Sequence, residues 1–294
     1  MKDVIIIGAG PAGLTAAIYL ARANKNVLVL EEKTYGGAIV NANIIENYPA
    51  NINITGFDFA TNLYNQVKNL GVKVKFEKVI SIKNNKIKEV ITNKDKYQTK
   101  AIIIATGTIN RKLGLNEDDY VGRGVSYCAT CDGNFYKNKT VAVVGGGNTA
   151  ISDAIYLADI CKEVYLIHRR DEFRAFGTNI ELLKKKKNVK FVLNSVITKL
   201  NGHDKLESIE INNKDTLNID GLFIAIGQNP NNEILLNLIN LDKDGYAKSN
   251  STLTNIKGIF VAGDIRHKKL RQLVTATSDG AMAAMEASEY LKDK

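Results

Sequence analysis

The sequence of 294 residues predicts an α/β protein built from two related domains, and two observations carry this prediction. A strand, a glycine-rich turn and a helix follow one another at the start of the chain, and the same pattern begins again at residue 140. Short alternating strands, typical of a small β-meander, follow each copy. The repetition indicates two halves in series. We therefore expect two Rossmann-like dinucleotide-binding domains, each with a small β-meander.

The first copy opens on an apolar strand at Asp3 to Ile7, which leads into the turn Gly8 to Gly13 and a helix at Leu14 to Ala23. The first glycine of such a turn permits the tight bend, the second lets a pyrophosphate approach the backbone, and the third lets helix and strand pack closely. A second strand, Asn26 to Leu30, ends at Glu31. A carboxylate there can bind the adenosine ribose and would repel a 2′-phosphate.

Between the two copies lies the segment Cys128-Ala129-Thr130-Cys131-Asp132. Two cysteines two residues apart can close a small disulfide or bind a metal, but the remaining Cys161 and three histidines show no paired ligand spacing. No metal is therefore expected. A redox pair near an electron carrier can pass two electrons to another disulfide. Asp132 could move a proton to or from a thiolate, or simply form a turn with Gly133.

The second copy has a strand at Thr140 to Val144, the turn Gly145 to Ala150 and a helix at Ile151 to Cys161. The next strand, Glu163 to Ile167, is followed by His168-Arg169-Arg170 where the first copy has an acidic residue. Arginine side chains can bind a 2′-phosphate through bidentate, charge-assisted hydrogen bonds. The second site should therefore prefer NADPH to NADH, although surface salt bridges are an alternative for clustered arginines.

The remaining elements complete both halves. We expect a helix at Phe57 to Leu70 in the first half and a final helix at about Ala276 to Leu291. Strands are expected at Val72 to Phe76, Lys86 to Thr92, Lys96 to Thr99, Ala101 to Ile104, Val189 to Asn194, Val196 to Leu200, Leu206 to Ile211, Gly221 to Ile226 and Ile259 to Val261.

Composition favours a soluble globular protein, with 45% hydrophobic and 24% charged residues. The longest apolar runs are far shorter than the ~20 residues of a membrane helix. A strand begins within three residues of the start, so we expect no signal peptide and a cytoplasmic location. Three cysteines, an odd number, favour one working pair, while Cys161 is expected to pack in a core.

The net charge of +9 raises the possibility of nucleic-acid binding. The lysines at Lys184 to Lys187 end a predicted helix, however, and no aromatic-studded basic face accompanies them. A solvated lysine-rich surface is the favoured interpretation. Steering of an acidic protein substrate by the positive potential is an alternative.

Together these motifs resemble the bacterial low-molecular-weight thioredoxin reductases over essentially the whole chain. The resemblance is carried by Gly8 to Gly13, Cys128 to Gly133, Gly145 to Ala150, His168 to Arg170 with Arg174, and Ala262 to Asp264 with Arg271 and Gln272. It implies a flavoprotein homodimer. FAD would lie in a discontinuous domain of residues 1–113 and 244–294, and NADPH in an inserted domain of residues 114–243. The joints between the domains would lie near residues 112–117 and 241–246.

The resemblance also implies roles for individual residues. Cys131 would face the flavin, Cys128 would attack the substrate disulfide, and Asp132 would act as acid or base. Asp264 would bind the ribityl-phosphate part of FAD. The implied FAD contacts are Gly8, Gly10, Pro11, Ala12, Gly13, Glu31, Gly36, Gly37, Asn47, Gly107, Gly263, Asp264, Arg271 and Gln272. The implied NADPH contacts are Gly145, Gly147, Asn148, Thr149, Ala150, His168, Arg169, Arg170 and Arg174.

Two positions depart from the pattern of this family. Ala38 follows the paired glycines where glutamine is usual, and Ser152-Asp153 stands in the central helix where paired glutamates are common. Neither affects the cysteine pair or the arginines. We therefore expect an NADPH-dependent oxidoreductase with FAD that reduces the disulfide of thioredoxin or a thioredoxin-like protein. A reductase of a glutaredoxin-like or peroxidase partner, and a non-catalytic redox sensor, are the alternatives.

Overall fold

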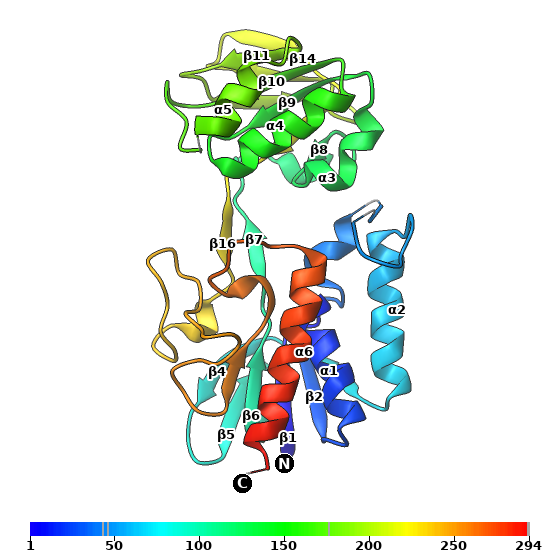
Figure 1. Cartoon of the computed structure of the whole chain (residues 1–294), viewed down its shortest axis with the longest axis vertical. Helices are drawn as coiled ribbons and strands as arrows, with labels where there is room; N and C mark the ends of the chain where they lie inside the picture. Colours follow the sequence, from blue (N-terminus) through cyan, green and yellow to red (C-terminus); the bar gives the residue numbers. More distant parts are fainter. Residues whose placement is uncertain (43, 46, 176, 293–294) are drawn as a thin grey trace. The chain divides into compact units, whose positions relative to one another are not determined.

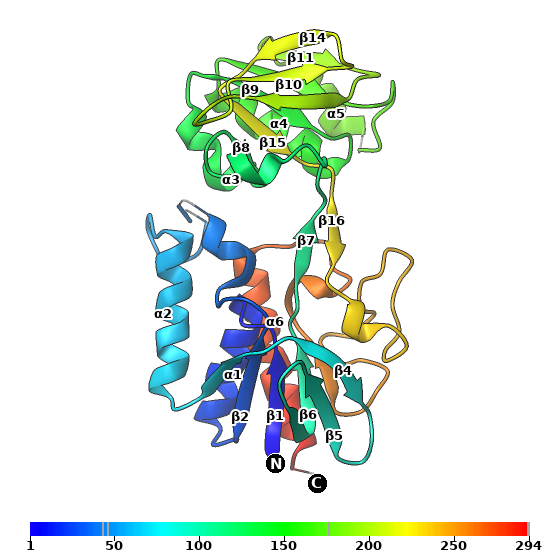
Figure 2. The same ribbon diagram turned by 180° about the vertical axis from the view of Figure 1, so that it is seen from behind.

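The structure is a computed structural model that describes residues 1–42, 44–45, 47–175 and 177–292. The chain forms two compact units, one of Met1–Ile109 with Asn229–Lys294 and one of Asn110–Gln228. It passes between them along β7 (Thr108–Asn110) and β16 (Gln228–Pro230), which pair in a two-stranded sheet (Figures 1 and 2).

At the second crossing the first unit resumes at residue 229, whereas the sequence analysis placed this boundary at residue 244. The segment between these positions contains Leu235 and Ile239, which are buried in one cluster with Ile5 and Ile7 of the first strand. Removing these side chains from water favours the attachment of the segment to the first unit. The first crossing lies close to the expected residue 113.

The first unit is built on a seven-stranded sheet whose order is β3-β2-β1-β6-β5-β4, with β17 also paired to β6. The long strand β6 pairs antiparallel with β5 over its first half and parallel with β17 over its second half. The two strands expected there are therefore one. The strands are β1 (Lys2–Ile7), β2 (Val27–Glu31), β3 (Lys73–Phe76), β4 (Val79–Lys83), β5 (Lys88–Thr92), β6 (Lys96–Ile104) and β17 (Ile259–Val261).

Three helices cover one face of this sheet: α1 (Pro11–Arg22), α2 (Gly56–Asn69) and α6 (Leu273–Tyr290), as Figure 1 shows. The helices α1 and α6 pack on each other, and α6 contributes mainly alanines to the shared core. A Cβ at Gly280 of α6 would collide with the carbonyl oxygen of Ala12 in α1. Small residues thus bring α6 against the first turn of α1.

The second unit repeats this plan with a five-stranded parallel sheet in the order β11-β10-β9-β15-β8. One face packs against α4, and the other against a three-stranded antiparallel meander. Its strands are β8 (Val125–Ser126), β9 (Thr140–Val144), β10 (Glu163–Ile167), β11 (Val189–Val192) and β15 (Gly221–Ile224), and the meander is β12 (Ile197–Asn201), β13 (Ser208–Ile211) and β14 (Asp215–Asn218). Its helices are α3 (Ala129–Asp132), α4 (Asn148–Ile160) and α5 (Gly177–Lys184).

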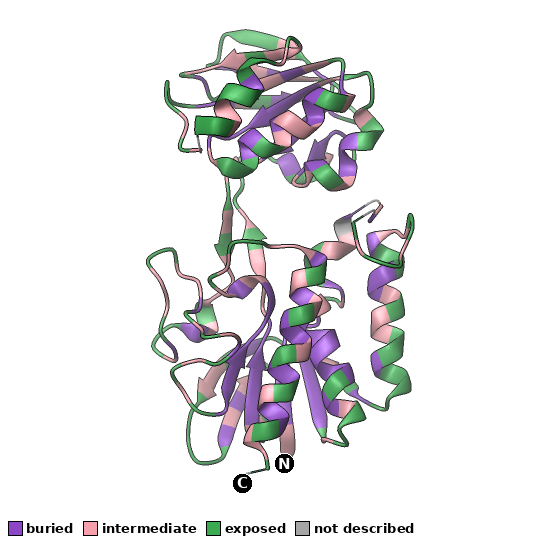
Figure 3. Ribbon diagram, in the orientation of Figure 1, coloured by how far each residue is buried: buried purple, intermediate pink, exposed green. Residues whose placement is uncertain are grey.

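Each unit has its own core, and Figure 3 shows the buried central strands of both sheets. Cys161 is the C-cap of α4 and lies in the core, as expected, and it is not paired in a disulfide. None of the described helices is long and apolar enough to cross a membrane. Short 3-10 helices occur at η1 (Gly37–Asn41), η2 (Glu117–Tyr120), η3 (Gly133–Tyr136), η4 (Glu233–Leu235) and η5 (Gly263–Ile265).

Candidate functional site

Cys128 and Cys131 form a disulfide with a Cα–Cα distance of 5.3 Å, which confirms the pairing expected from their spacing. Cys128 is the N-cap of the short helix α3, and its carbonyl oxygen accepts hydrogen bonds from the amides of Cys131 and Asp132. Both cysteines are half-buried. The helix packs against α4 of the same unit. The pair therefore sits on a short, locally hydrogen-bonded segment.

The carboxylate of Asp132 is buried and fixed by a residue that the sequence analysis missed. Ser126 Oγ donates to Asp132 Oδ2 at 2.6 Å and accepts from the amide of Cys128 at 3.0 Å. One hydroxyl thus links the carboxylate to the backbone of Cys128. This arrangement holds a carboxylate in place on the cysteine segment. The only feature of the sequence that could have indicated Ser126 is its position two residues before Cys128.

The turn of the first unit has the backbone that phosphate binding needs. Gly8 adopts a φ of +106°, and a Cβ there would collide with the carbonyl oxygen of Ala105. Gly10 is the N-cap of α1 with an extended backbone, and Pro11 occupies the first helical turn. The first amides of a helix lack partners within the helix, and the helix dipole favours an anion there. Ala12 and Gly13 continue this first turn.

Glu31 lies at the edge of the same turn. Its Oε2 accepts from the amide of Ala9 at 2.8 Å, and its Oε1 accepts from the amide of Lys33 at 3.0 Å. Gly36 donates to the carbonyl oxygen of Ala9 at 2.7 Å, and a Cβ on Gly37 would lie 3.2 Å from the Cα of Gly10. The fold thus brings the acidic residue and the paired glycines to the first glycine turn.

The C-terminal segment reaches the same place. A Cβ on Gly263 would lie 2.9 Å from the Cβ of Ala12 in α1. The next residue, Asp264, has a buried Oδ1 that lies 3.0 Å from Lys268 Nζ, yet has no partner in hydrogen-bond geometry among the described residues. A carboxylate oxygen has more than one lone pair, so this oxygen can accept a hydrogen bond from a further donor. A hydroxyl of the ribityl chain of FAD fits this requirement.

The other expected FAD contacts lie on three loops. Asn47 Nδ2 donates to Gln272 Oε1 at 3.0 Å, so two residues far apart in sequence meet. Arg271 lies over the ring of Tyr246, with 4.1 Å between the guanidinium carbon and the ring centroid. Gly107 follows β6 with a φ of +66°. Together with the glycine turn, these residues fit a flavin dinucleotide.

The turn of the second unit repeats the geometry of the first. Gly145 has a φ of +153°, and a Cβ there would collide with the carbonyl oxygen of Ala225. Gly147 is the N-cap of α4, and nothing lies within 4 Å of the position its Cβ would take. Asn148 and Thr149 are exposed at the start of the helix, and Ala150 is buried. The open N-terminus of α4 fits a second pyrophosphate.

The basic residues after β10 divide into two groups. His168 is buried, its Nε2 lies 3.2 Å from the carbonyl oxygen of Glu172, and its ring would obstruct any side chain at Gly146. Burial lowers the pKa of His168, and the nearby arginine charges add to this effect. The imidazole therefore packs against the glycine turn, and its lowered pKa favours the neutral form.

The arginines lie outside this packing. Arg169, Arg170 and Arg174 are exposed, and the amide of Arg174 donates to the carbonyl oxygen of Gly146 at 2.8 Å. This bond ties the loop to the glycine turn. Their guanidinium groups form no ion pair with any residue in the described part of the chain. Three free cations beside a dinucleotide turn fit a 2′-phosphate.

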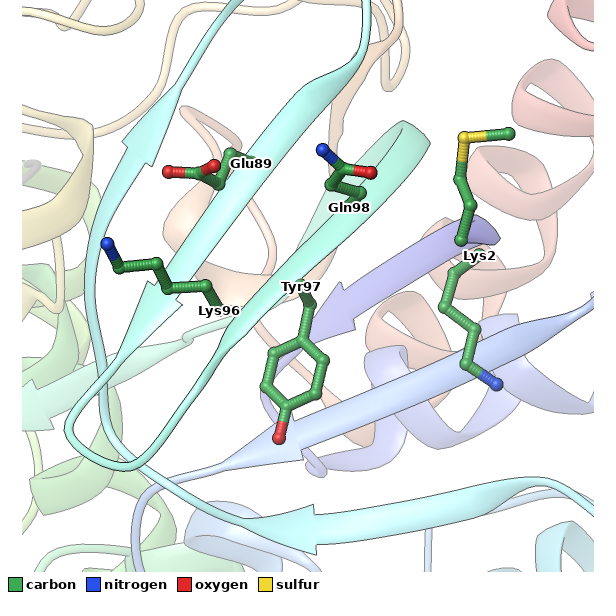
Figure 4. A pocket seen from close by; sticks show the side chains of 6 residues that line it. Lys2, Glu89, Lys96, Tyr97 and Gln98 are labelled. Carbon is green, nitrogen blue, oxygen red and sulfur yellow. The ribbon is translucent and has the colours of Figure 1, made fainter.

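A surface pocket of about 390 Å³ lies elsewhere in the first unit (Figure 4). It is lined by Lys2 at the start of β1 and by Lys96, Tyr97 and Gln98 at the start of β6. The glycine turn follows the opposite, carboxyl end of β1, which is the end where ligands bind in open α/β sheets. We therefore exclude this pocket from the candidate site.

Comparisons with known proteins agree with this geometry. A family model described as pyridine nucleotide-disulphide oxidoreductase matches residues 2–280. A thioredoxin reductase of Mycoplasma genitalium is 44% identical over 297 residues, covering 98% of this chain and 94% of the relative. A thioredoxin reductase of Listeria monocytogenes is 40% identical over 300 residues, covering 99% and 94%.

A solved structure is similar over the same extent. The crystal structure of thioredoxin reductase from Streptococcus pyogenes superposes with a TM-score of 0.90 at 39% identity and covers 100% of this chain and 99% of that one. Both the disulfide and the two glycine turns lie within the matched residues. The chain therefore belongs to the pyridine nucleotide-disulphide oxidoreductases, among the bacterial thioredoxin reductases.

Proposed function

We propose that this protein transfers electrons from NADPH through FAD to the Cys128–Cys131 disulfide, and from the resulting dithiol to the disulfide of thioredoxin. The observation that carries the proposal is the cysteine pair itself, formed as a disulfide in a chain that also has two intact dinucleotide turns. Electron transfer from a nicotinamide through a flavin to a disulfide uses both dinucleotide turns and the cysteine pair.

The first unit would hold FAD, which when bound supplies the redox centre between the nicotinamide and the dithiol. The free amides at the start of α1 would bind its pyrophosphate. Glu31 would bind the adenosine ribose, and Asp264 Oδ1 would accept from the ribityl chain. Asn47, Arg271 and Gln272 would contact the remainder of the cofactor.

The second unit would hold NADPH. The start of α4, with Gly147, Asn148 and Thr149, would bind the pyrophosphate. The guanidinium groups of Arg169, Arg170 and Arg174 would bind the 2′-phosphate. Because His168 is buried and neutral, its part would be to keep the glycine turn in place.

The reduced cysteine pair would carry out thiol–disulfide exchange. Cys128 Sγ would attack one sulfur of the substrate disulfide, forming a mixed disulfide and releasing the other substrate sulfur as a thiolate. Cys131 Sγ would then attack Cys128 Sγ, which re-forms the enzyme disulfide and releases the second substrate thiol. The two thiol protons end on the substrate sulfurs. Asp132, held by Ser126, would give and take these protons.

The proposal also includes the oligomeric state and the cellular location. The helix α6 leaves the apolar side chains of Val274, Met282 and Met285 exposed, and this supports a homodimer through the first unit. A dithiol that must be reduced in each cycle suits a reducing compartment, so we place the enzyme in the cytoplasm.

The test is turnover. The purified protein is mixed with NADPH, a thioredoxin and a chromogenic disulfide, and NADPH oxidation is followed. We expect turnover that Cys128→Ser abolishes and that Cys161→Ser leaves intact, because Cys161 is buried and takes no part in the disulfide. Oxidation no faster than in the Cys128→Ser variant would remove the proposal.

The alternatives give different results in the same assay. A reductase of another partner would turn over with a glutaredoxin-like or peroxidase protein in place of thioredoxin. A redox sensor would show a dithiol that titrates with oxidant but no turnover with NADPH.

A further inference from the structure

We propose that Lys268 is a positioning residue for FAD, acting through Asp264, and that Asp279 of α6 anchors it in place. The inference rests on the proposed function, because it concerns the affinity of the first unit for FAD. It assigns a role to two charged side chains, Lys268 and Asp279, that the sequence motifs did not mark.

Lys268 joins two carboxylates. Its side chain is only 12% exposed, and its Nζ lies 3.0 Å from Asp264 Oδ1 and 3.1 Å from Asp279 Oδ2. Arg266 pairs with the other carboxylate oxygen of Asp279 and donates to Ser249 Oγ at 3.1 Å. Two negative and two positive side chains thus form one largely buried cluster with no net charge.

The cluster lies against the first turn of α1. The amide of Gly263 donates to Asp279 Oδ2 at 3.1 Å, which ties the C-terminal loop to α6. Both Gly263 and Gly280, the neighbours of the two carboxylates, approach Ala12 so closely that a Cβ on either would require a shift. The backbone next to both carboxylates therefore lies against the start of α1, where the pyrophosphate of FAD is proposed to bind.

Electrostatics makes Lys268 necessary at this place. FAD carries an anionic diphosphate, and an uncompensated carboxylate beside it would repel it strongly in a water-poor environment. Lys268 is the cation that pairs with the carboxylate of Asp264. Arg266 is paired with Asp279 and Ser249, and Arg271 donates to the backbone carbonyl oxygen of Asp264. Without Lys268 the cluster would carry a net negative charge.

The geometry of the Lys268–Asp264 pair fits a role in positioning. The two groups lie 3.0 Å apart, yet Asp264 Oδ1 has no hydrogen-bond partner in the described part of the chain. The lysine thus supplies charge while the oxygen keeps its capacity to accept a hydroxyl donor.

The experiment measures FAD affinity of the apoprotein by quenching of FAD fluorescence. We expect Lys268→Met to raise the Kd at least about tenfold, a size reasonable for loss of one partner of a buried ion pair. Lys268→Arg should stay within about threefold of wild type because it keeps the charge. Lys269→Met, which removes the same charge from the exposed neighbouring residue, should stay within about twofold.

A second comparison separates positioning from folding. In an Asp264→Asn background the carboxylate charge is gone, so Lys268→Met should weaken FAD binding less than about threefold further. An unchanged tenfold penalty there, or a wild-type Kd for Lys268→Met alone, would overturn the inference. If the Met variant does not fold, as judged by circular dichroism of the apoprotein, Lys268→Gln gives the same comparison. Failure of the wild-type protein to bind FAD would instead remove the proposed function.

Discussion

The arginines after β10 allow the sharpest test of nucleotide selectivity. The change is Arg169→Ala combined with Arg170→Ala. Both side chains are exposed and form no ion pair with described residues, so their loss should leave the fold unchanged. Each charge-assisted contact to a 2′-phosphate contributes about 1.5 kcal/mol at such an exposed site, hence about 3 kcal/mol together. That corresponds to a loss of roughly 100-fold in kcat/KM for NADPH.

NADH serves as the internal reference, because it has no 2′-phosphate. We expect its kcat/KM to change less than about threefold. The assay is steady-state thioredoxin reduction with each nucleotide in turn. Lys185→Ala with Lys187→Ala removes two exposed charges from the same unit and should affect both nucleotides equally and weakly. Equal losses with NADPH and NADH in the arginine variant would show that these side chains do not bind the phosphate.

Three further changes test other parts of the account. Ser126→Ala removes the donor to Asp132 and should slow thioredoxin reduction about threefold to tenfold without changing the KM for NADPH, as stopped-flow and steady-state rates together would reveal. Burial raises the pKa of Asp153 to about 7, so the native state keeps a proton that the unfolded chain releases above about pH 4; stability therefore falls as pH rises through this window. Asp153→Asn should therefore stabilise the protein more at pH 8 than at pH 5, and the Tm measured at each pH checks this. The difference in the free energy of unfolding should be about 1–2 kcal/mol, because the side chain is only half-buried. An equal effect at both pH values would contradict the assignment. Burial also raises the pKa of Cys161 to about 11, so iodoacetamide at neutral pH should alkylate the reduced Cys128–Cys131 pair and spare Cys161, which mass spectrometry can check.

Backbone requirements explain why the turns could be predicted. Gly8 and Gly145 adopt a positive φ where the backbone closely approaches a neighbouring segment. Only glycine fits such a position, so the requirement is visible in the sequence. The buried strands Thr140–Val144 and Glu163–Ile167 were predicted residue for residue, because each apolar run ends sharply, the first at Gly145 and the second at His168.

Exposed edges and long-range contacts explain what was missed. The strands β4 and β14 carry mostly exposed or half-buried side chains at the edge of a sheet, so no apolar alternation marks them. His168 extends β10, and the pleat turns its ring toward the core, whereas sequence alone groups it with the arginines.

The cluster around Asp279 could not be predicted either. Its members belong to a loop and to α6, and the helix register that brings Asp279 to Lys268 is set by packing of α6 on α1. No local pattern records such packing. Ser126 was closer to detection, since it lies beside the cysteine motif.

The central claim is that a protein-bound flavin and the Cys128–Cys131 disulfide form one electron pathway. An anaerobic reductive titration of the FAD-loaded protein, followed by flavin absorbance, tests it most directly. The account predicts that wild type takes up one more two-electron equivalent than a Cys128→Ser, Cys131→Ser double variant before the flavin is fully reduced. Equal uptake by the two proteins would contradict it.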